Sequence, residues 1–201
     1  TDSIWAYQRH NYGYRNLRSF PLMQDFHGLP YIDVRLSFNS FVPADLNENL
    51  GARLVDYYIS CLCNEPTLHD KVEFEIVFSC YSLDFPDRIK HLIQNGFSQS
   101  DCREIADSLR ALTNRILHPK DGLWRLDAKK MDTLNSRREK LAVSKTNLLG
   151  QIYWLIEDIK RYGTLPFAGL ARAGFVAVQM LHSLVALGVF SKSDQDAFLQ
   201  G

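Results

Sequence analysis

The sequence predicts an α+β fold, a predominantly α-helical single domain with a small β-sheet, over residues 1–201. Two stretches, near 31–38 and 71–79, alternate apolar and polar residues as half-buried strands do. Most of the remaining chain repeats apolar residues at helical spacing. Because no internal repeat or low-complexity linker interrupts these patterns, we expect one domain.

The two predicted strands each have one apolar and one charged face. In the first, Ile32, Val34, Leu36 and Phe38 alternate with Asp33 and Arg35. In the second, Val72, Phe74, Ile76 and Phe78 alternate with Glu73 and Glu75. A helix from Pro43 to Asn64 separates them, so either relative orientation of the strands is possible.

Cap signals and apolar periodicity predict the helices. Asp45 and Glu48 form a capping pattern, as do Ser98 with Asp101 and Ser191 with Asp194, each pair three residues apart. The charged stretch 120–143 and the amphipathic stretch 144–162 predict a projecting helical arm near 120–162. Gly163 is expected to end its second helix, and the apolar stretch that follows is expected to be a buried helix.

Composition bounds the class of protein. Lys+Arg and Asp+Glu both number 23, so the formal net charge is zero, and we expect no nucleic-acid partner. The longest apolar run, 173–190, contains Gln179 and His182, so a core helix is expected rather than a membrane span. The four cysteines lack zinc-site spacing and are expected to be reduced thiols of a cytoplasmic protein. The chain starts at Thr1 without Met, which suggests an excised central fragment of a larger multidomain enzyme.

Standard catalytic motifs are absent from the sequence. It contains no nucleotide-binding glycine loop, no H-E-x-x-H and no G-x-S-x-G, and its six histidines are scattered without metal-ligand spacing. We therefore expect no catalytic residue, metal or cofactor within this chain.

The charged face of the predicted sheet is the leading candidate site. Arg35 offers a guanidinium for a phosphate or carboxylate, and Asp33, Glu73 and Glu75 offer carboxylates for hydroxyls. Alternatively, these residues only pair across the strands. Arg172, at the start of an apolar helix, either pairs with a carboxylate or points into a site.

Residues 1–27 are rich in aromatic and cationic side chains. They could hold an anionic or planar ligand, with Arg9, Arg15 or Arg18 on the anion and Tyr7, Tyr12 and Tyr31 as walls of the site. The alternative is an amphipathic segment whose rings cover the core while the cations stay in solvent.

Four motifs carry a resemblance to a known family: SIWAYQR at 3–9, LPYIDVRLSFNSF at 29–41, LHDKVEFEIVF at 68–78 and FAGLARAGF at 167–175. They resemble the middle region of large bacterial phosphoenolpyruvate synthase-like, or phosphoenolpyruvate-utilising, proteins. That group is similar to the dikinase-type phosphotransferases, in which an ATP-grasp domain and a phosphohistidine domain pass a phosphoryl group to an acceptor.

The resemblance implies an acceptor-binding domain of an ATP-dependent phosphotransferase, inactive alone. ATP and Mg²⁺ are then expected in the full-length enzyme, with ATP-grasp and phosphohistidine domains of the same parent chain and a small-molecule acceptor as partners. The rival hypothesis is a non-catalytic interaction module that docks neighbouring domains through its arm. RNA binding by the Arg/Tyr-rich start is a third, and the neutral total charge argues against it.

Overall fold

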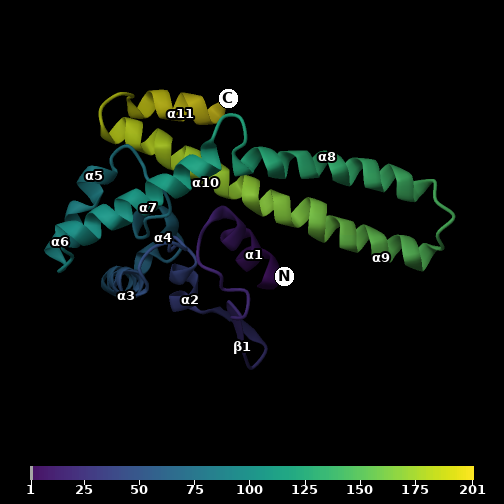
Figure 1. Cartoon of the computed structure of the whole chain (residues 1–201), viewed down its shortest axis with the longest axis horizontal. Helices are drawn as coiled ribbons and strands as arrows, with labels where there is room; N and C mark the ends of the chain where they lie inside the picture. The colour runs from purple at the N-terminus through teal and green to yellow at the C-terminus, as the bar shows by residue number, and fades with distance from the viewer. Residues whose placement is uncertain (1) are drawn as a thin grey trace.

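The computed structural model describes residues 2–201, with side chains from Ile4 onward. It confirms a mostly helical α+β fold with a small two-stranded antiparallel sheet. Figure 1 shows a body of helices with a small hairpin, and a long helical arm that projects from it.

The body begins with a helix and a hairpin. Helix α1 spans Asp2–Tyr12, and strands β1 (Met23–Phe26) and β2 (Leu29–Ile32) pair in the register Met23↔Ile32. His27 and Gly28 join the strands with φ of 56° and 82°. Positive φ at both positions matches the type I′ turn that suits the twist of a two-residue hairpin.

Short helices and two long ones complete the body, in the order α2 (Val34–Asn39), α3 (Glu48–Asn64), η1 (Pro66–Leu68), α4 (Val72–Glu75), α5 (Phe85–Arg88), α6 (Lys90–Gln94) and α7 (Gln99–Leu117). The main core lies between α2, α3, α7 and the segment that follows α4; it includes Phe38, Leu54, Tyr58, Val77 and Ile105. A second cluster, of Tyr12, Tyr14, Leu112 and Ile116, joins α1 to α7.

The predicted strand positions are wrong. Only the start of the first stretch is a strand, because residues 34–39 form α2 behind the Asp33 cap, whose carboxylate accepts from Leu36 N at 2.8 Å. In the second stretch, Val72–Glu75 is helix α4, and the residues after it are buried without a strand partner. The charged sheet face expected from these stretches therefore does not exist.

The arm is a helical hairpin. It consists of α8 (Leu123–Ala142) and α9 (Leu148–Asp158), and Arg137 Nε bonds Asp158 Oδ1 at 2.7 Å between them. Helix α9 continues through a π-helical turn, η2 (Ile159–Thr164), into α10 (Leu165–Ala186), as Figure 1 shows. Gly163 does not end the helix as expected. Helix α11 (Lys192–Gln200) packs against α10.

The run Leu148–Ala186 spans 39 residues and is long and apolar enough to cross a membrane by length and composition. The core helix of a soluble protein can meet the same criterion, although only 33% of the most apolar window is buried here. The absence of a membrane partner stays a prediction.

Candidate functional site

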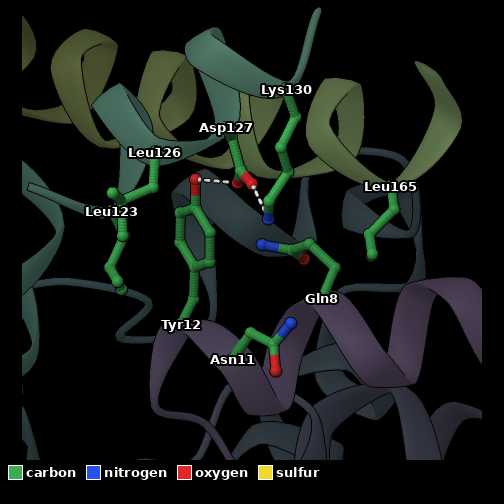
Figure 2. Close-up of a pocket in the computed structure, with 8 residues that line it drawn as sticks. All are labelled: Gln8, Asn11, Tyr12, Leu123, Leu126, Asp127, Lys130 and Leu165. Carbon is green, nitrogen blue, oxygen red and sulfur yellow. Dashed lines mark hydrogen bonds and ion pairs between the residues drawn. The ribbon is translucent and has the colours of Figure 1, made fainter. Parts of the chain in front are cut away.

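A cavity of about 250 Å³ lies between α1 and the base of the arm (Figure 2). On α1, positions 8, 11 and 12 share one face, and on α8 positions 123, 126, 127 and 130 do the same at helical spacing. The lining residues are Gln8, Asn11, Tyr12, Leu123, Leu126, Asp127, Lys130 and Leu165. The cavity therefore combines a leucine-lined wall with several polar groups, the usual composition of a small-molecule site.

Asp127 is the centre of the polar wall. Its Oδ2 accepts a hydrogen bond from the Tyr12 hydroxyl at 2.7 Å, and its Oδ1 accepts one from Lys130 Nζ at 2.8 Å. Only 6% of Asp127 is exposed. Burial, together with the bond to Asp127, raises the pKa of Tyr12 well above its ordinary value, so Tyr12 stays a neutral donor.

A glycine on α10 makes this arrangement possible. A Cβ at Gly169 would overlap Asp127 Oδ2 and the Tyr12 hydroxyl. The backbone of α10 therefore approaches the pair as closely as only glycine permits.

Gln8 supplies an unused donor. The residue is 4% exposed, and its Nε2 has no hydrogen-bond partner among the described residues. Figure 2 shows this amide directed into the space between the Tyr12 ring and Lys130. An unpaired buried amide costs about 1–3 kcal/mol of folding free energy. A ligand oxygen that accepts a hydrogen bond from Gln8 would remove this cost, which favours binding.

Together these groups suit a small molecule with hydroxyl or carbonyl oxygens. Asp127 can accept from a ligand hydroxyl, while Gln8 and Lys130 can donate to ligand oxygens. The three leucines would cover its carbon skeleton. No three His, Cys, Asp or Glu side chains within residues 4–201 are grouped as a metal site would require.

Most of the predicted site residues lie elsewhere. Asp33 and Arg35 both line another cavity, beside Leu17 and Phe20, but Asp33 caps α2 and Arg35 pairs with Asp56 at 2.7 Å. Both members of this ion pair are about 60% exposed (60% and 61%).

Glu73, Arg172 and Arg9 do come together, inside the body. Arg172 forms a two-bond ion pair with Glu73, and Arg9 lies 4.5 Å from the Phe41 ring centroid. Burial, followed by repulsion from Arg172, lowers the pKa of Arg9 to about 9. Glu75 does not join them, because it is exposed on α4.

Arg15, Tyr31 and Arg18 occupy three separate places. Arg15 Nη1 bonds Asn39 Oδ1 at 2.8 Å, and Tyr31 is 51% exposed on β2. Arg18 lines a cavity next to the one in Figure 2, with Tyr7. Thus Tyr7 and Tyr12, but not Tyr31, are walls of cavities near α1.

Gln8, Asp127 and Lys130 were not among the predicted site residues. The charged stretch 120–143 has the composition of a solvent-exposed helix face, so the sequence does not distinguish Asp127 from the other charged residues there. A usable signal was present, because Asp127 lies midway between Leu123 and Met131, on the apolar stripe of that helix. A carboxylate at such a position is buried when the stripe packs.

No protein-family model, curated protein or solved structure matches this chain.

Proposed function

We propose that this chain binds a small polar molecule in the Asp127 cavity and positions it as the acceptor of an ATP-dependent, phosphohistidine-type phosphotransferase. The binding role rests on the buried Gln8 amide, whose Nε2 has no hydrogen-bond partner among the described residues and which lines the cavity with the Asp127–Lys130 pair. The sequence resemblance supports the phosphotransfer role.

In this role Asp127 would accept a hydrogen bond from the acceptor hydroxyl, and Lys130 and Gln8 would hold its other oxygens. During transfer the acceptor oxygen bonds phosphorus while the phosphorus–nitrogen bond of the phosphohistidine breaks. The hydroxyl proton must leave at the same time, and the Asp127 carboxylate would receive it as a general base. The ATP-grasp and phosphohistidine domains of the parent chain would supply ATP and Mg²⁺ chemistry.

The test uses the intact protein with ATP and a metabolite pool. Nucleotide products, acid-labile phosphate on the protein and phosphorylated metabolites are followed together. Asp127→Asn is expected to abolish transfer to the acceptor while the phosphohistidine still forms. Asp132→Asn, an exposed change on the same helix, is the matched control. Transfer at the wild-type rate by Asp127→Asn would contradict the proposal, as would a protein that never turns over ATP.

A second candidate function is docking of a neighbouring domain by the arm. Helix α9 exposes apolar side chains, including Leu149 at 78%, Tyr153 at 58% and Ile156 at 50%, which share one face. Exposed apolar surface of this kind marks interaction sites. The double substitution Leu149→Gln and Tyr153→Gln changes only exposed positions and should spare folding. If the double variant no longer associates with the neighbouring domain but still binds ligand, docking is favoured. Unchanged association of the two domains would contradict docking.

A further inference from the structure

A second cavity, of about 450 Å³, adjoins the first along α1. Leu165 lines both cavities, and Tyr7 of the second precedes Gln8 of the first. Its lining comes from α1, from the segment after α1 that carries Arg18, and from the helical turn around Lys160 and Arg161. The two cavities therefore form neighbouring compartments beside one helix.

The second cavity has an excess of positive charge. Its lining includes three cations, Arg18, Lys160 and Arg161, and one carboxylate, Glu157. Glu157 is already engaged, because Oε1 accepts from Lys160 Nζ at 2.5 Å and Oε2 from Arg161 Nη2 at 3.4 Å. The hydrogen bond from Lys160 lowers the pKa of Glu157, so this carboxylate stays ionised and neutralises one of the three positive charges.

Arg18 is the cavity cation that no described carboxylate pairs with. Its Nε donates to Asn16 Oδ1 at 2.9 Å, and its guanidinium lies 5.4 Å from the Tyr7 ring centroid. No carboxylate among the side chains that the structure describes, from Ile4 onward, lies within ion-pair distance of it. The amide and the ring thus hold Arg18 in place while leaving its charge available.

The π-helical turn presents the other two cations. The second cavity is lined by residues 157, 160, 161, 164 and 165, so this part of the helix directs them to one side. Leu165 N donates to Lys160 O, a five-residue step that widens the helix just before Pro166. Pro166 has no N–H and would crowd the carbonyl four residues earlier, which explains a widened turn here. Isolated π-turns of this kind are frequent at functional sites.

We propose that this second cavity binds the phosphate group of a soluble ligand. The two uncompensated charges match a phosphate dianion, and guanidinium groups offer it paired N–H donors. The inference rests on the proposed binding function and makes it more specific. The ligand would be a small phosphorylated molecule whose phosphate meets Arg18, Lys160 and Arg161, and whose hydroxyl reaches Asp127 through the compartment beside Leu165.

The test is a calorimetric titration of the intact protein with inorganic phosphate at low ionic strength. Arg18→Gln is the decisive variant, because it removes a cation that pairs with no described carboxylate and so leaves none of these acids unpaired. Loss of one charge-assisted hydrogen bond, about 1.5–3 kcal/mol, should weaken phosphate binding by roughly tenfold or more. The matched control is Arg103→Gln, an exposed arginine on α7 with the same change in net charge, which should bind phosphate as the wild type does.

Three results would overturn the inference. They are no saturable phosphate binding, equal weakening by Arg18→Gln and Arg103→Gln, and Arg18-dependent binding only to vesicles of anionic phospholipid. Asp127→Asn separates this inference from the proposed function. This variant should leave phosphate binding intact. Loss of phosphoryl transfer with retained phosphate binding supports both the acceptor role and the phosphate site. Retained transfer with Arg18-dependent phosphate binding contradicts only the proposed acceptor role.

Discussion

Glu73 and Arg172 are 99 residues apart in the chain and form a two-bond ion pair inside the body, with Arg172 Nη2 bonded to Glu73 Oε2 at 2.8 Å. The side chains are 15% and 2% exposed. The pair connects α4 to α10, and through α10 it connects the body to the helix that continues into the arm. It is therefore a structural tie between segments that the sequence separates.

Breaking this tie on one side should be costly. Glu73→Gln or Arg172→Met leaves a buried charge without its partner, and we expect each to lower the free energy of unfolding by about 3–5 kcal/mol. Urea denaturation measures it. The double variant should lose clearly less than the two single losses combined, and strictly additive losses would contradict the tie.

The exposed pair of Arg35 and Asp56 should matter little. Arg35→Ala is expected to lower the free energy of unfolding by less than about 1 kcal/mol, because solvent screens the pair. It should also leave phosphoryl transfer unchanged, since Arg35 lies outside both cavities along α1. Impaired transfer with normal phosphohistidine formation would instead restore Arg35 to the site.

Gly169 and Gly174 provide a matched pair on α10. Gly169→Ala should destabilise the protein by about 1–3 kcal/mol and weaken ligand binding, because the new methyl group overlaps Asp127 and Tyr12. Gly174→Ala has no atom within 4 Å of the new Cβ and should stabilise the helix by about 0.5–1 kcal/mol. Thermal denaturation and calorimetric binding measure both effects. A Gly169→Ala protein as stable as Gly174→Ala would contradict the close approach.

Ionisation of the Cys80 thiol should lower the free energy of unfolding at alkaline pH. Burial raises the pKa of its thiol from 9.0 to about 11, so between these values the unfolded chain loses a proton that the folded chain keeps. The contribution of the Cys80 thiol to the free energy of unfolding is fully present below pH 9 and is lost as the pH rises through 11. At about 1.4 kcal/mol per pKa unit it amounts to no more than about 3 kcal/mol.

The measurement compares urea denaturation at pH 8 and pH 11 for the wild type and Cys80→Ala. The variant creates a small cavity at both pH values, so only the difference in pH dependence is informative. We expect a smaller alkaline loss in Cys80→Ala. Identical pH dependence in the two proteins would exclude this role of the Cys80 thiol.

Local signals predicted many helix ends correctly. The capping boxes of Ser98 with Asp101 and of Ser191 with Asp194 are both confirmed. The cap of α3 is Asn47 rather than Asp45, whose carboxylate instead accepts from the Ser108 hydroxyl. A cap signal depends on neighbouring residues alone, whereas a tertiary hydrogen bond can engage the same side chain and move the cap to another residue.

The stretch after α4 shows why the strand prediction failed. Its backbone is satisfied by side chains instead of a neighbouring strand. Phe78 N donates to the Tyr58 hydroxyl at 3.0 Å, and Ser79 O accepts from the Tyr14 hydroxyl at 2.6 Å. Alternating apolar residues predict burial on one face of a strand, but they do not specify which groups satisfy the backbone.

The sequence by itself determined the helical class, several caps and the periodic apolar faces, because these depend on residues only a few positions apart. Only the tertiary structure decided that Gln8 and Tyr12 line one cavity with Asp127, and that Arg18 lines another with Lys160 and Arg161. Members of each set are more than a hundred positions apart in the chain, so only the folded backbone brings them together, with Gly169 letting α10 approach Asp127 and Tyr12 closely.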